Sequence, residues 1–256
     1  MYYDTHAHLN ADNYLYNVED IIKEAFNEGV KLINVIGFDP KTNKLANKIA
    51  QSHHNIYASA GLHPTDVDNF STQDLIDLEF YLKQEITVAV GECGLDYYWN
   101  KDTKSKQFFY FEKQIELAKK YQKPIIIHVR DAFLDSYEIL KDAVKDGLLT
   151  GVMHCYSGSL EMAEKFLDLG LYISLGGPVT FKNAKTPKEV AKVVPIDRLL
   201  IETDCPYLAP HPYRGKENKP SLLPLIAQEI SQIKDIPIDT VGFQTTENGK
   251  KLFKIK

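Results

Sequence analysis

The stretch Tyr2-Tyr3-Asp4-Thr5-His6-Ala7-His8 opens the chain with an apolar lead into a His-x-His pair. On an extended strand, side chains two residues apart point to the same face, so we expect the imidazoles of His6 and His8 to lie side by side. Such a pair suits one metal ion. The alternative interpretation is a pair of partly exposed or hydrogen-bonded histidines with no ligand role.

The same residue types recur further along the chain, and this recurrence favours the metal site. Each of the four further candidates follows an apolar, strand-like run. They are Glu92, His128, His154 and Asp204. Six side chains of ligand type, all at predicted strand ends, indicate one shared site rather than unrelated polar positions.

Apolar runs alternate with helix-period segments along the whole chain. The predicted strands are residues 2–5, 32–36, 56–61, 87–90, 124–128, 151–154, 171–175 and 198–203. Most are continuously apolar, which is typical of parallel strands covered on both faces. Predicted helices include residues 104–121, 134–144, 160–169, 187–193 and 221–233. We therefore expect an α/β fold, a single-domain (β/α)8 barrel of TIM type over residues 1–256. A doubly wound open sheet is less favoured, because no glycine-rich dinucleotide turn is present.

The bulk properties fit a cytoplasmic enzyme. The chain has 256 residues, a formal net charge of -5, and 44% hydrophobic residues. We expect no signal peptide and no membrane span, and the odd count of three cysteines fits a reducing compartment. The acidic balance argues against tight, extended binding of DNA. A nuclease that holds only a strand end, with metal ions meeting the phosphate, needs no basic surplus. We expect a monomer.

The three cysteines each follow a predicted ligand directly. They are Cys93, Cys155 and Cys205. Period-two alternation should turn them away from the ligand face, so we expect buried packing residues and no catalytic thiol.

In a (β/α)8 barrel the carboxyl ends of all strands meet on one rim, so the six candidates should converge there. Four histidines and two carboxylates are more than one tetrahedral ion needs. They suit two divalent ions with one carboxylate between them. Zn²⁺ and Mn²⁺ accept imidazole ligands readily, and Mg²⁺ stays a candidate although it usually takes more oxygen ligands.

Five further residues are candidates for binding substrate. We expect His63 to contact phosphate. Arg130 is either a phosphate clamp or the partner of a loop acid. Tyr156 and Tyr207 either stack on bases of a single strand or simply pack. Arg214, in the loop after the last strand, either binds phosphate or is solvated.

Motifs along nearly the whole chain resemble, in order, those of the TatD-type deoxyribonucleases. The main ones are Asp4-Thr5-His6-Ala7-His8, Gly61-Leu62-His63-Pro64, Gly91-Glu92-Cys93-Gly94-Leu95-Asp96-Tyr97, His128-Val129-Arg130-Asp131, His154-Cys155-Tyr156-Ser157-Gly158, Ile201-Glu202-Thr203-Asp204-Cys205-Pro206 and Pro212-Tyr213-Arg214-Gly215-Lys216.

The resemblance implies a divalent-metal hydrolase on an amidohydrolase-like barrel, acting as a deoxyribonuclease that trims DNA from the 3′ end and favours single strands. By motif position the ligand sets are His6, His8 and Asp204 for one ion, His128 and His154 for the other, and Glu92 between them.

The mechanism that we expect is hydrolysis of a phosphodiester by a water activated between two metal ions. Asp204 would both bind metal and take the proton from this water. Glu202 would orient Asp204 or a ligating histidine. One alternative is hydrolysis of an ester or amide, such as an aminoacyl-tRNA bond. A non-catalytic barrel that binds metal structurally is the least favoured, because structural sites are closed.

Overall fold

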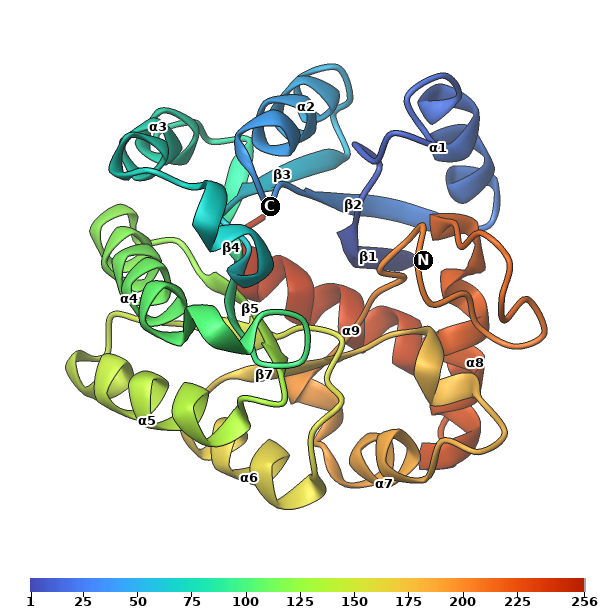
Figure 1. Cartoon of the computed structure of the whole chain (residues 1–256). Coiled ribbons are helices and arrows are strands. Elements are labelled where there is room, and N and C mark those ends of the chain that lie inside the picture. Colours follow the sequence, from blue (N-terminus) through green and yellow to red (C-terminus); the bar gives the residue numbers. More distant parts are fainter. Residues whose placement is uncertain (256) are drawn as a thin grey trace.

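The computed structural model describes residues 1–255 and shows an eight-stranded parallel barrel surrounded by helices (Figure 1). Each strand pairs with its neighbours in the sequence. The strands are β1 (Tyr2–Ala7), β2 (Val30–Ile36), β3 (Ile56–Ala60), β4 (Thr87–Asp96), β5 (Ile125–Arg130), β6 (Gly151–Met153), β7 (Tyr172–Leu175) and β8 (Leu199–Ile201). The predicted (β/α)8 fold is confirmed.

The first and last strands meet through side-chain and loop contacts just beyond β8. Asp204 donates its backbone N–H to His6 O at 2.9 Å. The buried carboxylate of Asp4 accepts from the backbone N–H of Thr203 at 2.9 Å and from its hydroxyl at 2.6 Å. These bonds bring the segment after β8 alongside β1, so that residues from the two ends of the chain share one site.

Helices alternate with the strands and form a ring outside the barrel (Figure 1). They are α1 (Val18–Asn27), α2 (Pro40–Gln51), α3 (Thr72–Leu82), α4 (Lys104–Tyr121), α5 (Phe133–Ala143), α6 (Leu160–Asp168), α7 (Lys185–Val193), α8 (Leu223–Lys234) and α9 (Ile238–Phe253). The sequence analysis did not locate α2, which starts at a capping box between Asp39 and Thr42. Within residues 1–255, no helix is long and apolar enough to cross a membrane.

The fourth strand is longer than predicted, so Glu92 lies inside it rather than at its end. The sequence analysis ended this strand at Val90. β4 instead continues, with a shift of register against β5 at this point, and all ten of its residues are buried. Gly91 and Gly94 take φ values of +134° and +144°, a region open to glycine. A side chain on Gly94 would also meet His128 O at 2.0 Å.

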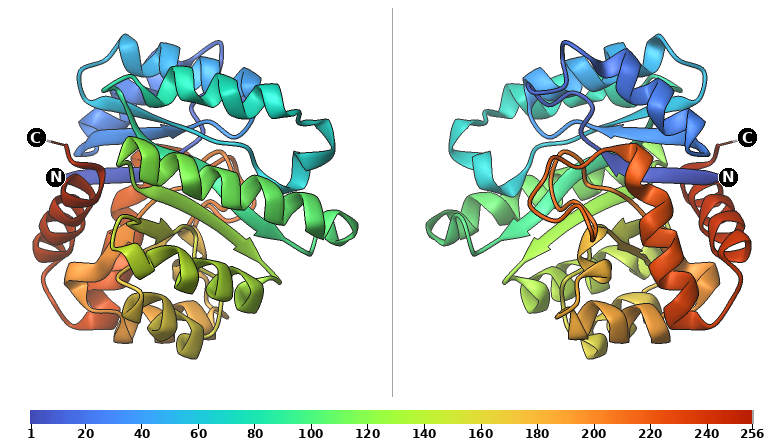
Figure 2. Two further views of the ribbon diagram at one scale, coloured as in Figure 1. Left: turned by 90° about the vertical axis from the view of Figure 1, so that its left-hand side faces the viewer. Right: turned by 90° about the vertical axis from the view of Figure 1, so that its right-hand side faces the viewer.

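The amino-terminal end of the barrel is closed by α9. Figure 2 shows α9 and both chain ends at this end, opposite the strand arrowheads. The ring of Phe253 packs edge-on against Tyr3, with centroids 5.9 Å apart, and both residues belong to one buried apolar cluster. Gly249 lets the helix approach, because a Cβ there would lie 2.7 Å from the Tyr3 ring. Only the opposite end of the barrel is left to open as a site.

Candidate metal centre

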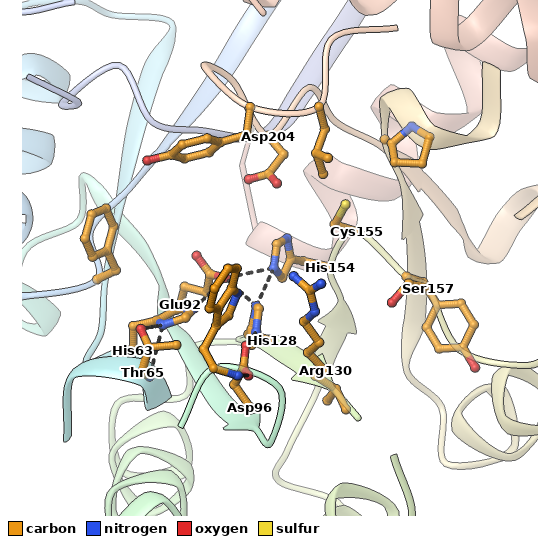
Figure 3. Close-up of a pocket in the computed structure, with 18 of the residues that line it drawn as sticks. His63, Thr65, Glu92, Asp96, His128, Arg130, His154, Cys155, Ser157 and Asp204 are labelled. Carbon is orange, nitrogen blue, oxygen red and sulfur yellow. Dashed lines mark hydrogen bonds and ion pairs between the residues drawn. The ribbon is translucent and has the colours of Figure 1, made fainter. Parts of the chain in front are cut away.

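A cavity of about 870 Å³ opens at the carboxyl end of the barrel (Figure 3). Five of the six predicted ligands line it, and they are His8, Glu92, His128, His154 and Asp204. The sixth, His6, is fully buried directly behind them. The structure therefore brings together all six side chains that the sequence singled out.

The His-x-His pair has the predicted same-face geometry. The Nε2 atoms of His6 and His8 lie 3.3 Å apart. Asp204 faces the pair, because its Oδ1 lies 3.3 Å from Nε2 of His8 and 3.7 Å from Nε2 of His6. On the far side of its ring, Nδ1 of His8 lies 3.3 Å from Ile36 O, which fixes the ring. These three side chains present their donor atoms to one point.

Glu92 stands between two groups of histidines. Its Oε2 lies 3.3 Å from Nε2 of His6 and 3.8 Å from Nε2 of His8. Its other oxygen, Oε1, lies 2.8 Å from Nε2 of His154 and 3.0 Å from Nδ1 of His128. Each carboxylate oxygen thus faces a different group of histidines.

Electrostatics favour an ionised carboxylate at the centre. Burial alone would raise the pKa of Glu92, but the neighbouring histidines, above all His154, outweigh it and hold this pKa well below its usual value. Burial next to His154 lowers the pKa of His6. An ionised Glu92 and a neutral His6 can bind metal directly. Glu92, together with Glu202, also outweighs burial and raises the pKa of His154 well above its usual value, so a cation that binds there would displace a proton from this ring.

The donor atoms fit divalent cations. Imidazole nitrogens and carboxylate oxygens converge from both sides, and within residues 1–255 three triplets have ligand atoms within 4.8 Å of one another. The triplets are His6–His8–Glu92, His63–Glu92–His128 and His6–His154–Glu202. The buried Nδ1 of His6 also has no hydrogen-bond partner among residues 1–255. So many nitrogen and oxygen lone pairs at short distance repel one another unless cations bind between them. The assignment of each residue to a particular ion stays a prediction.

Two buried carboxylates hold the histidines from behind. Oδ2 of Asp96 lies 2.9 Å from Nε2 of His128. Oε1 of Glu202 lies 3.2 Å from Nδ1 of His154, and its other oxygen accepts from the hydroxyl of Ser174 at 2.5 Å. Carboxylates in this position fix the ring orientation of a ligating histidine and raise its basicity. Of the two predicted jobs for Glu202, the geometry favours orienting a histidine over orienting Asp204.

Asp96 was missed by the sequence analysis because the predicted strand ended before it. Asp96 lies four residues after Glu92 in a continuing strand, and this even spacing is the signal that would have found it.

His63 directly contacts the predicted metal ligands, which a residue that only binds phosphate would not need to do. Its Nε2 is 3.4 Å from Oε1 of Glu92, and its Nδ1 is 2.7 Å from the hydroxyl of Thr65. Its ring lies 4.5 Å from that of His128. Burial lowers the pKa of His63, so its neutral form is favoured. The structure thus offers His63 as a further ligand candidate besides its predicted role toward phosphate.

Arg130 and Tyr207 line the cavity, as a role in substrate binding requires. No carboxylate among residues 1–255 lies within ion-pair distance of Arg130, so the alternative of a loop acid as its partner is not realised. Its guanidinium instead lies 3.8 Å from the ring centre of Tyr98. Tyr207 is 57% exposed, and its ring lies 6.0 Å from that of His8.

The other two substrate candidates lie less favourably. Tyr156 is only 5% exposed, its ring packs against Phe133, and its hydroxyl donates to Ser159 O at 2.7 Å. It touches the cavity but has the contacts of a packing residue. Arg214 is exposed, does not line the cavity, and rests over the ring of Phe181 at 4.3 Å.

Cys155 departs from the cysteine prediction. Cys93 and Cys205 are buried as expected, but Cys155 lines the cavity beside His154 (Figure 3). β6 ends at Met153, and Cys155 has a φ of +40°, so period-two alternation no longer applies there. Burial raises the pKa of Cys155 well above its usual value, which argues against a reactive thiolate.

The sequence and the fold have close counterparts among known proteins. In Bacillus subtilis, an uncharacterised metal-dependent hydrolase, YabD, is 47% identical over 255 residues and covers 100% of both chains. The crystal structure of YJJV, a TatD homologue from Escherichia coli, superposes with a TM-score of 0.94 at 28% identity, over 100% of this chain and 98% of that one. A TatD family hydrolase from Entamoeba histolytica has a TM-score of 0.89 at 25% identity, over 100% and 98%.

The family model described as TatD related DNase matches residues 3–254, nearly the whole chain. Together with the whole-length relatives and the converging donor atoms, this match makes the protein a metal-dependent hydrolase. The chain belongs to the family of TatD related DNases.

Proposed function

We propose that this protein is a metal-dependent deoxyribonuclease that shortens single-stranded DNA from its 3′ end. The observation that carries the proposal is the placement of Glu92, whose two oxygens each face a separate group of histidines. Such an arrangement suits two neighbouring cations. Divalent ions held there would supply a water of lowered pKa and neutralise charge on the phosphoryl oxygens.

The surrounding residues supply the rest of a phosphodiester hydrolysis. Asp204 points into the cavity across from Glu92 (Figure 3), and its Oδ2 has no hydrogen-bond partner among residues 1–255. Burial would raise the pKa of Asp204, but its hydrogen bond with His8 and the nearby charges of His6 and His154 together outweigh burial and lower it. An ionised Asp204 can accept the proton of the attacking water. The new P–O bond then replaces the bond to the leaving strand, whose oxygen takes a proton from solvent.

The charge distribution supports a strand end rather than a long duplex as the substrate. Apart from the acids of the metal cluster, the lining described within residues 1–255 carries Asp66 and Asp131 against one basic side chain, Arg130. A long track of phosphates would meet repulsion around such a rim. One or two phosphates at the metals and Arg130 would not. We also propose that the enzyme acts as a monomer.

The decisive assay follows single-stranded DNA carrying a label at either end. The protein is stripped of metal and then supplied with Mg²⁺, Mn²⁺ or Zn²⁺. Progressive shortening from the 3′ end is expected, lost in Glu92→Ala and kept in Glu85→Ala, an exposed acid outside the cavity. A folded, metal-loaded protein that cleaves no DNA but hydrolyses a chromogenic ester would refute the nuclease and favour the ester or amide alternative.

A further inference from the structure

An exposed tryptophan stands on the rim of the cavity. Trp99 is the single tryptophan in the chain, lines the cavity, and is 68% exposed. An indole this exposed leaves a large apolar face in water, which is unfavourable unless something covers it. Tyr98 beside it is 54% exposed, and the two rings meet edge to face with centroids 4.8 Å apart.

The loop that carries Trp99 is held by backbone hydrogen bonds although the indole itself is largely exposed. Oδ1 of Asp96 accepts the backbone N–H groups of Tyr98 and Trp99, at 2.9 and 2.8 Å. The amide of Gln107 donates to Asn100 O at 2.7 Å and to Asp96 O at 2.9 Å. Because the backbone is already ordered, binding to the indole costs little conformational entropy.

The same carboxylate ties the loop to the metal centre. While Oδ1 of Asp96 holds the loop, its Oδ2 holds His128. Trp99 is thereby placed at a fixed distance from a predicted metal ligand. A phosphate at the metals and a flat group on Trp99 would be positioned relative to each other by one side chain.

Arg130 completes the arrangement. Its guanidinium carbon lies 3.8 Å from the Tyr98 ring centre and 5.5 Å from that of Trp99. Stacking on Tyr98 orients the guanidinium and leaves it without an anionic partner, since no carboxylate among residues 1–255 pairs with it. Arg130 extends into the cavity toward His154 (Figure 3). A cation and an aromatic face are thus presented side by side.

We propose that Trp99 and Arg130 form a binding site for one nucleotide, with the base stacked on the indole and the phosphate paired with the guanidinium. The inference rests on the proposed nuclease function and adds that the site binds one nucleotide of the DNA strand. A base stacked on Trp99 has left its own stack, so this base must be unpaired. Preference for single-stranded ends then follows from Trp99 and not from the metal centre.

The test combines a variant at Trp99 with removal of one base from the substrate. Trp99→Ala should raise the KM for a single-stranded oligonucleotide roughly 5- to 150-fold, the range of one base–aromatic stack, with little change in kcat. Trp99→Phe keeps a stacking face and should recover most of this loss. Phe80→Ala removes an equally exposed aromatic ring on α3, outside the cavity, and should leave KM unchanged.

The matching substrates carry an abasic unit at one of the last three positions. At one position, and only there, the wild type should lose affinity and Trp99→Ala should have no further effect, because the two changes remove the same contact. An effect of Trp99→Ala that is equal on every substrate, or absent, overturns the inference while the nuclease function stands. A wild type that cleaves no oligonucleotide overturns both.

A direct readout uses the single tryptophan. An oligonucleotide with cleavage-resistant phosphorothioate linkages should quench the fluorescence of the full-length protein on binding. The same oligonucleotide with the abasic unit at the sensitive position should bind less tightly and quench less. Equal quenching by both would contradict stacking on Trp99.

Discussion

Nε2 of His128 lies 2.9 Å from Oδ2 of Asp96, a carboxylate that is itself fully buried. Burial alone would lower the pKa of His128, but the hydrogen bonds with Asp96 and Glu92 outweigh it and raise this pKa. The ring is thus oriented with Nδ1 toward Glu92, at 3.0 Å, and Nε2 toward Asp96. Because the second oxygen of Asp96 holds the Trp99 loop, one residue supports both the metal centre and the rim.

Asp96→Asn should weaken metal binding without unfolding the protein. The amide oxygen still accepts from the loop, but the charge that supports His128 is lost. Removing such an outer partner typically costs about 10- to 100-fold in metal affinity or activity. Metal titration of the stripped protein measures this loss. Asp135→Asn is the control, since Asp135 bonds the Tyr97 hydroxyl outside the cluster, and an unchanged affinity in Asp96→Asn would remove Asp96 from its supporting role.

Asp204→Asn should leave a folded but nearly inactive protein. The amide keeps the shape of the side chain and can still face His8, but it cannot accept a proton from water. Loss of a general base typically lowers kcat by roughly 10²- to 10⁴-fold. The rate is measured at saturating metal, with metal content determined in parallel. Substantial turnover by a fully loaded variant would exclude Asp204 as the base.

The protein should fold without metal, because the barrel has a large core independent of the cluster, and bound metal should stabilise it further. Binding at a hundred times Kd adds about 2.7 kcal/mol. For a chain of this size that corresponds to a rise in Tm of roughly 5–11 °C. Thermal melts with and without Mn²⁺ measure the shift, and Glu92→Ala should abolish most of it. Unfolding on removal of metal, with no activity in any metal, would instead indicate a structural site.

Gly249→Ala should destabilise the protein by disturbing the contact between α9 and the amino-terminal end of the barrel. Its new Cβ would lie 2.7 Å from the ring of Tyr3, on the strand that carries His6 and ends just before His8. Overpacking of this kind costs about 1–3 kcal/mol. Urea unfolding measures the loss, with Lys251→Ala, an exposed change on the same helix, as the control. Equal stability of both variants would show that α9 shifts without strain.

Most of the site could be predicted from the sequence, because in a parallel barrel the carboxyl ends of all strands lie on one rim. His6, His128 and Asp204 come from distant parts of the chain, yet an apolar run before each was enough to predict their convergence. Asp96 was not predicted because β4 continues to Asp96, past its predicted end at Val90. Cys155 was wrongly predicted to point away from the ligands, because its positive φ interrupts the period-two alternation of side chains.

What the sequence left open was the environment of each aromatic ring. Tyr156 and Tyr207 both follow predicted ligands and were equal candidates for stacking on bases. Only the packing separates them, since one ring is covered by Phe133 and Phe166 and the other is 57% exposed. Trp99 lies beyond the point where the fourth strand was predicted to end, so no pattern marked it as part of the rim.

The two tyrosines give a prediction in which stability and substrate binding separate. Tyr156→Phe removes a hydroxyl that donates to Ser159 O, so it should cost about 0.5–1.5 kcal/mol of folding free energy and leave KM unchanged. Tyr207→Ala removes an exposed ring at the cavity mouth, so it should raise KM and leave Tm within about 1 °C of the wild type. Urea unfolding and steady-state kinetics on single-stranded DNA are measured for both variants. The reverse pattern, a raised KM in Tyr156→Phe and none in Tyr207→Ala, would mean that substrate reaches the packed side of the cavity and that the exposed ring is incidental.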